Sequence, residues 1–213
     1  MKKIEESRTW AALALLLAAC SGSAAAGGGA ATGGVTKRDT AIKHEDCDTA
    51  SATEKIDANN DGRPDIFITR ECRAIDLNFD GVIDSYSYMD GSGRLRRREY
   101  DYDKDGQIDE IATYNAGVLT EKDQATSMAR KLDTWDFYQN GALARSERDS
   151  NGDGVVDQWW EYTQPGCPTI HSDVNNDGKP DPGATVDYCK ETGYVPPERQ
   201  GPAAAQTPDC NKA

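Results

Sequence analysis

The chain has 213 residues, of which 37% are hydrophobic and 8% aromatic, so it can bury only a modest core and is not a large enzyme with a deep interior. Its 37 acidic and 24 basic residues give a formal charge of -13, which argues against a nucleic-acid partner because such proteins need clustered Lys and Arg. Sixteen of the 37 acidic residues lie in five short segments, and this density favours bound cations.

The first twenty residues have the build of a secretory signal. A basic start precedes an apolar stretch over residues 10–19, which is too short to span a bilayer comfortably. The stretch ends in LAAC, which resembles the lipobox of bacterial lipoproteins. That resemblance implies removal of residues 1–19 and acylation of Cys20, and Ser21 after it fits sorting to the outer membrane. We expect an exported, lipid-anchored protein of the outer membrane or cell surface, in either orientation; the alternative is an ordinary signal peptide.

Composition also divides the rest of the chain. Residues 20–41 begin with the lipidated cysteine and continue with small residues without apolar periodicity, which predicts a flexible tether. Residues 193–213 are rich in Pro and Ala and predict a disordered tail. The folded domain is therefore expected over residues 42–192.

One nonapeptide of the form D-x-[ND]-x-D-G-x-x-D recurs in this region. The copies are DANNDGRPD at 57–65, DLNFDGVID at 76–84, DYDKDGQID at 101–109, DSNGDGVVD at 149–157 and DVNNDGKPD at 173–181. The starts at 101, 149 and 173 differ by 48 and 24, which predicts a further copy at 125–133. That segment reads ATSMARKLD and keeps only Asp133, so we expect it to hold the architecture without a metal.

Apolar residues recur at fixed positions relative to these segments. The eighth position holds Pro64, Ile83, Ile108, Leu132, Val156 and Pro180, and the eleventh holds Phe67, Tyr86, Ile111, Trp135 and Trp159. Between the acidic segments, Gly-containing tips separate short aromatic and β-branched runs, as in β-hairpins. An even period of 24 returns equivalent residues to the same face of a strand. The sequence therefore predicts an all-β fold, an antiparallel up-and-down meander of tandem hairpin repeats with acidic loops along one edge.

The acidic loops carry the oxygen ligands that calcium prefers, at the alternate positions that a tight loop turns toward one centre. The Gly at the sixth position permits the sharp turn, and no Cys or His stands at a ligand position, which disfavours zinc and copper. Asp, Asn and Gly also favour turns without metal, but five copies that keep the ninth Asp favour calcium. We expect four or five Ca²⁺ ions. The candidate ligands are Asp57, Asn59, Asp61, Asp65, Asp76, Asn78, Asp80, Asp84, Asp101, Asp103, Asp105, Asp109, Asp149, Asn151, Asp153, Asp157, Asp173, Asn175, Asp177 and Asp181.

The nonapeptide resembles the calcium loops of EF-hands, of thrombospondin type 3 repeats and of FG-GAP repeats. EF-hands place a bidentate Glu at the twelfth position, where this sequence has residues such as Ile68, Ala112 and Trp160. An acid at the ninth position before a β-type run is similar to the FG-GAP loops, and that resemblance implies an ion held within a β-hairpin.

The cysteines bracket the first and last loops. Cys47 and Cys72 flank the loop at 57–65, and Cys167 and Cys189 flank the loop at 173–181. Because export permits disulfides and terminal repeats have only one neighbour, we expect the pairs Cys47–Cys72 and Cys167–Cys189 to close the ends of the array. Cys210 would be left over in the tail.

Catalytic motifs are absent from the sequence, so we expect a non-enzymatic protein. The first hypothesis is a calcium-rigidified structural or adhesion module of the cell envelope, whose partners are the membrane, through Cys20, and a protein or polysaccharide. The alternative is an accessory module that binds carbohydrate or peptidoglycan through an aromatic sheet face. The same aromatics can instead pack a core.

Overall fold

The computed structural model describes residues 35–196. They form one twelve-stranded sheet in which every strand pairs with its neighbour in sequence, and all pairs are antiparallel. The expected all-β up-and-down meander is confirmed. The strands are β1 (Glu54–Ile56), β2 (Ile66–Ile68), β3 (Cys72–Ile75), β4 (Ser85–Met89), β5 (Leu95–Tyr100), β6 (Glu110–Asn115), β7 (Val118–Gln124), β8 (Thr134–Gln139), β9 (Ala142–Arg148), β10 (Gln158–Gln164), β11 (Cys167–Ser172) and β12 (Thr185–Asp187).

Within residues 35–196, helical structure is limited to two short elements near the ends of the sheet. A 3-10 turn, η1 (Thr49–Ser51), precedes β1, and α1 (Tyr188–Thr192) follows β12. No helix within residues 35–196 is long and apolar enough to cross a membrane.

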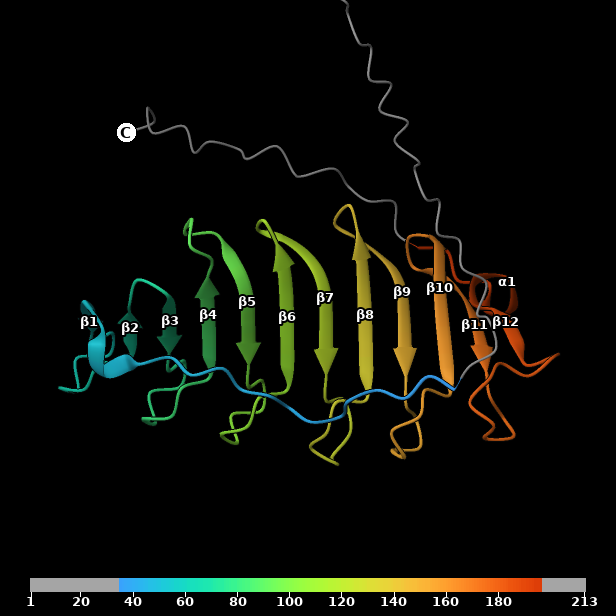
Figure 1. Ribbon diagram of the computed structural model, residues 1–213, viewed down its shortest axis with the longest axis horizontal. Coiled ribbons are helices and arrows are strands. Elements are labelled where there is room, and N and C mark those ends of the chain that lie inside the picture. Colours follow the sequence, from blue (N-terminus) through green and yellow to red (C-terminus); the bar gives the residue numbers. More distant parts are fainter. Residues whose placement is uncertain (1–34, 197–213) are drawn as a thin grey trace, which may run out of the picture. The chain divides into compact units, whose positions relative to one another are not determined.

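The strand ends form two opposite borders of the sheet, which we call its edges, and each edge carries its own kind of connection, as Figure 1 shows. The acidic segments lie at one edge, and we call them loop 1 (57–65), loop 2 (76–84), loop 3 (101–109), loop 4 (149–157) and loop 5 (173–181). The segment at 125–133, the degenerate loop, lies at the same edge. At the other edge, Ala116 and Gly117 have φ values of 52° and 84°. Asn140 and Gly141 have φ values of 51° and 76°. Two consecutive positive φ values are typical of a type I′ hairpin turn.

Backbone hydrogen bonds join neighbouring loops. The N–H of Asp101 donates to the carbonyl of Asp84 at 2.9 Å, and the N–H of Asp149 donates to that of Asp133 at 2.9 Å. The N–H of Asp173 donates to the carbonyl of Asp157 at 2.8 Å. The first residue of one loop is thus bonded to the ninth residue of the preceding loop, so the loops lie side by side along the edge.

The core lies on one face of the sheet, close to the loops. It consists of eighth-position and eleventh-position residues from three consecutive units, so the apolar stripe expected from the period of the sequence packs a core. Tyr86 and Phe137 are half-buried against it, and Phe67 lies outside the cluster. The cluster contains Ile108, Ile111, Leu132, Trp135, Val156 and Trp159.

The core is covered by residues 35–48, which we call the strap. Figure 1 shows it as the blue segment that crosses the strands near the loop edge. Ile42 packs against the core cluster, and the strap bonds to the loops through Arg38 N–H to Gly154 O (3.2 Å) and Val156 N–H to Thr36 O (3.0 Å). Residues 35–41 were expected in the tether and 42 was the expected start of the domain. The start is corrected to residue 35 because these backbone contacts are part of the fold; residues 20–34 lie outside the described residues, as does Cys20.

Both expected disulfides are present. Cys47 and Cys72 join the end of the strap to β3 with a Cα–Cα distance of 6.0 Å. Cys167 and Cys189 join β11 to α1 with a Cα–Cα distance of 5.4 Å. Each lies near one end of the array, at the third and the eleventh of the twelve strands, where an end repeat has a neighbour on one side only.

Three carboxylates with the same period of 24 lie on the covered face between the apolar residues. Glu99, Asp123 and Glu147 pair across strands with core residues such as Ile111 and Trp135. The strap supplies ion-pair partners for two of them: His44 Nδ1 lies 2.6 Å from Glu99 Oε2, and Arg38 Nε donates to Glu147 Oε2 at 2.7 Å. Sequence reasoning missed this row, because its partners lie 55 and 109 residues away.

Asp123 is the member of this row that is not fully paired. Its Oδ1 is buried without a hydrogen-bond partner. Burial, followed by the charge of Glu121, raises the pKa of Asp123 to about 6, although Arg38 and Arg97 act in the opposite direction. The ionised form of this side chain is therefore disfavoured in the folded protein.

We expect Asp123→Asn to stabilise the protein by on the order of 2 kcal/mol at a pH of about 8 and to change little at a pH of about 4. The folded-state pKa exceeds the ordinary value of 3.8, so the native state binds more protons than the unfolded state in this range, and stability falls as the pH rises. Urea unfolding in calcium-free buffer measures the difference. Asp46→Asn, an exposed change on the strap, is the matched control. Parallel pH profiles for wild type and Asp123→Asn would contradict the expectation.

Candidate metal centres

The first aspartate of each loop organises the loop backbone. In loop 3, Asp101 Oδ1 accepts from the N–H of Lys104 at 2.6 Å, and Oδ2 accepts from the N–H of Gly106 at 2.7 Å. Gly106 has a φ of 86°, a backbone conformation in which a side chain is strained, which explains Gly at the sixth position. The equivalent bonds to Gly62, Gly81, Gly154 and Gly178 are present in the other loops.

The ninth aspartate closes each loop from the other side. In loop 2, Asp84 Oδ2 accepts from the N–H of Leu77 at 2.6 Å and of Asn78 at 3.3 Å. In loop 4, Asp157 Oδ2 accepts from the N–H and the hydroxyl of Ser150 at 3.0 and 2.8 Å. Backbone N–H groups thus saturate one oxygen of this carboxylate in each loop.

The second oxygen is both buried and without a partner in two loops. Asp84 is 1% exposed and Asp157 is 6% exposed, and the Oδ1 atom of each is buried and accepts no hydrogen bond. A buried carboxylate oxygen without a donor is costly unless a cation or a water molecule satisfies it. These two atoms are the observation in the structure that fits a cation best.

The third position separates loop 3 from the other loops. In loops 1, 2 and 5, the amide of the third-position asparagine donates to a loop carboxylate: Asn59 to Asp61 at 3.0 Å, Asn78 to Asp80 at 2.8 Å and Asn175 to Asp181 at 2.7 Å. In loop 4, Asn151 donates to Asn176 of loop 5 at 3.4 Å. Loop 3 has Asp103 at this position, and its one side-chain amide, that of Gln107, donates to Asp105 at 3.4 Å.

Loop 3 consequently gathers three carboxylates that accept hydrogen bonds from backbone N–H groups and from no side-chain amide. Oxygens of Asp101, Asp103 and Asp109 lie within 4.8 Å of one another, and this cluster can hold a metal ion. Burial raises the pKa of Asp101, partly offset by the hydrogen bonds from Gly106, Lys104 and Asp105, and the charge of Asp109 raises it further. Asp105, the remaining expected ligand of this loop, pairs with Arg130 of the neighbouring loop, whose Nη2 lies 2.8 Å from Asp105 Oδ2. Sequence reasoning missed Arg130.

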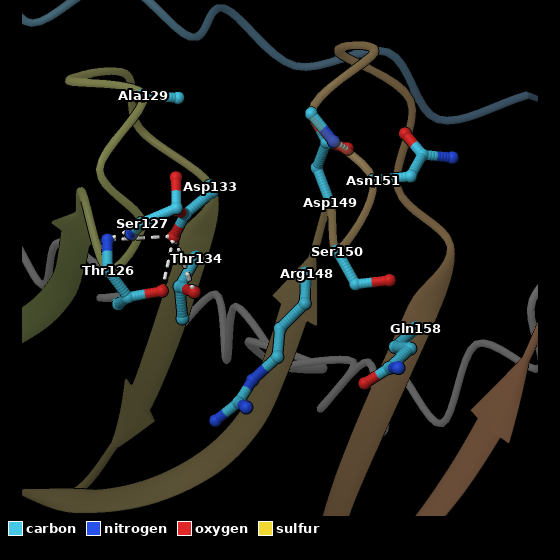
Figure 2. Close-up of a pocket in the computed structure, with 11 residues that line it drawn as sticks. Thr126, Ser127, Ala129, Asp133, Thr134, Arg148, Asp149, Ser150, Asn151 and Gln158 are labelled. Atoms are coloured by element: carbon cyan, nitrogen blue, oxygen red, sulfur yellow. Dashed lines mark hydrogen bonds between the residues drawn. The ribbon is translucent and has the colours of Figure 1, made fainter.

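The degenerate loop satisfies its one remaining carboxylate with hydroxyl and backbone donors, as Figure 2 shows. Asp133 Oδ1 accepts from the hydroxyls of Thr126 at 2.7 Å and Thr134 at 3.0 Å, and Oδ2 accepts from the N–H of Ser127 at 2.8 Å. Burial raises the pKa of Asp133, but these hydrogen bonds outweigh burial and hold the pKa below its usual value. This loop keeps the closure by the ninth aspartate and the positive φ at the sixth position, with side-chain donors in place of further acidic residues.

A cavity of about 480 Å³ lies between the degenerate loop and loop 4. It is lined by Thr126, Asp133, Arg148, Asp149 and Gln158 among others, and Figure 2 shows these side chains, which come from both loops and from the ends of β9 and β10.

We expect Thr126→Val to destabilise the protein by about 1–2 kcal/mol, because Asp133 loses a hydroxyl donor while it stays buried. Thr126→Ser, which retains the hydroxyl, should be close to wild type. Thermal unfolding with calcium and with a chelator is the measurement, and the loss should be equal in both, because this loop lacks the other ligands. A loss that appears only with calcium would argue against this account of the degenerate loop.

Comparison with known proteins gives little for this chain. No protein-family model and no curated protein sequence matches it. A solved structure described as "accessory secretory protein 1,2 and 3 in Streptococcus pneumoniae" is similar with a TM-score of 0.28 and 11% sequence identity, over 51% of this chain and 18% of that chain. The matched part is thus under a fifth of that structure's chain, and a likeness at this level identifies neither family nor function.

Proposed function

We propose that the protein is a non-enzymatic, calcium-binding module of the bacterial cell envelope, whose loops bind several calcium ions along one edge of the sheet. The observation that carries the proposal is the pair of buried, unpartnered carboxylate oxygens on Asp84 and Asp157, each inside a repeated acidic loop. Each nine-residue loop brings carboxylate and amide oxygens together, and calcium, a hard cation, prefers such oxygen ligands.

The electrostatics of the loops support the same proposal. Each loop holds three or four carboxylates within nine residues, and like charges at such short range repel. Asparagine amides and backbone N–H groups offset this repulsion only in part, since they carry no net charge. A divalent ion would neutralise the loop and stabilise the folded state by binding to it alone.

An exported location is consistent with the two disulfides, because disulfides persist in oxidising compartments. Together with the lipobox-like segment that ends in Cys20, this supports a protein tethered to a membrane by lipid, with the sheet as a rigid structural or adhesion module. Affinities on the order of 10⁻⁴ to 10⁻³ M would suit calcium-rich surroundings outside the cell.

Calorimetry of the purified protein with calcium tests this function. We expect four or five sites, and a melting temperature that rises in millimolar calcium and falls in chelator. Asp84→Asn should remove one site, because the buried oxygen loses its charge, and Asp46→Asn outside the loops should keep the wild-type number. No heat of binding at millimolar calcium, or a melting temperature unmoved by chelator, would exclude the function.

A second candidate function is glycan binding through the face of the sheet opposite the strap, which we call the open face. The aromatic residues at the eleventh position include Trp135 and Trp159, and both are buried in the core, so they are not available to sugars. On the open face, Trp160 and Tyr100 are half-buried and are stacked by Arg148 at 4.1 Å and Arg98 at 4.3 Å. Among the described elements, α1 packs against β11 and β12.

Retention on insoluble peptidoglycan or polysaccharide tests the second candidate. Trp160→Ala should abolish retention, because sugar rings stack on aromatic side chains, and Tyr194→Ala, an exposed aromatic after α1, should not change it. Equal retention of both variants, or none for wild type with and without calcium, would rule the candidate out.

A further inference from the structure

Arg130 occupies an unusual place in the degenerate loop. It stands at the sixth position, where each of the five acidic loops has glycine, and its φ is 54°. A non-glycine residue in this left-handed conformation is uncommon and carries a backbone cost. The loop thus retains a strained arginine at a position where glycine would fit without strain.

The side chain of Arg130 reaches into loop 3. Its Nη2 lies 2.8 Å from Oδ2 of Asp105, the fifth-position acid of that loop. The other oxygen, Oδ1, accepts from the N–H of Gln107 at 3.0 Å, as expected for this turn. A cavity of about 240 Å³ lies between the two loops, and Arg130 lines it together with Asp103, Asp105 and Asp109.

Loop 3 is also the loop in which a positively charged side chain offsets the most carboxylate repulsion. It has four aspartates and no asparagine amide, and three of its carboxylates lie within 4.8 Å of one another. Among residues 35–196, the salt bridge that a loop 3 carboxylate makes is with the guanidinium of the degenerate loop, at Asp105 beside this cluster.

We propose that Arg130 is a tethered cation that stabilises loop 3 when it is empty and lowers its affinity for calcium. This inference rests on the proposed calcium function. The guanidinium offsets carboxylate repulsion before an ion binds, and it repels a divalent ion once that ion is bound. It also holds one oxygen of Asp105, which lowers the negative charge available to the ion.

The expected effect is selective for one loop. An exposed ion pair contributes little to stability on its own, so the empty protein should lose only a little stability without Arg130. The repulsion of a divalent ion a few ångströms away is larger, so loop 3 should bind calcium about three to ten times more tightly without it. The other loops lie farther from this side chain and should keep their affinities.

The test compares Arg130→Gln, Arg130→Lys and Arg70→Gln in the full chain, with calcium followed by calorimetry. Arg70→Gln removes a positive charge that makes no salt bridge among residues 35–196, so it controls for net charge. The sites of loop 3 are identified as those lost in Asp101→Asn combined with Asp103→Asn. Terbium luminescence excited through tyrosine gives a second readout, because Tyr102 is the second residue of loop 3 and is 58% exposed.

Tighter binding in loop 3 for Arg130→Gln, with wild-type behaviour for Arg70→Gln and an intermediate or wild-type affinity for Arg130→Lys, would support the inference. A slightly lower melting temperature of Arg130→Gln in chelator would support the stabilising role in the empty loop. If wild type binds calcium and Arg130→Gln binds it equally or more weakly in loop 3, the inference is overturned and the proposed function stands. An absence of calcium binding in wild type would overturn the proposed function and the inference with it.

Discussion

Repulsion among the carboxylates at one edge of the sheet is the constraint on which the rest of this structure depends. The hairpin repeat brings the ends of successive strand pairs together, so every acidic loop lies beside another acidic loop. The chain opposes the repulsion in several ways. Backbone N–H groups bond to the first and ninth aspartates, asparagine amides bond to neighbouring carboxylates, hydroxyls surround Asp133, and a guanidinium pairs with Asp105. Only the last of these carries a compensating charge.

The same repeat explains why a single sheet can have a core. Since the period of 24 is even, the eighth and eleventh positions of successive units fall on one face and form a continuous apolar stripe. A sheet with one apolar face needs a second layer to exclude water. Here the second layer is the strap, an extended segment that contributes Ile42 to the core and ion pairs to Glu99 and Glu147.

The features that the sequence predicts are those that recur or that lie close together in the chain. The strands, the hairpin turns, the loop positions and both disulfides follow from a period and from cysteines that bracket a loop. The strap did not follow, because residues 35–41 are polar and without periodicity, and Arg38 meets Glu147 across 109 residues. The pairing of Arg130 with Asp105 was missed for a related reason: it joins two different loops, and a degenerate copy carries no pattern of its own.

The strap is hydrogen-bonded to the backbone of the loops, so the cover of the core and the order of the loops depend on each other. In loop 4, the N–H of Gly154 donates to Asp149 while its carbonyl accepts from Arg38 of the strap. The next core residue, Val156, has no exposed surface, and its N–H donates to Thr36. A shift of loop 4 would therefore disturb the strap and a core side chain together. The backbone of an acidic loop is therefore part of the packing of the protein. Because of this, neutralising the carboxylates of the loop would stabilise the whole sheet.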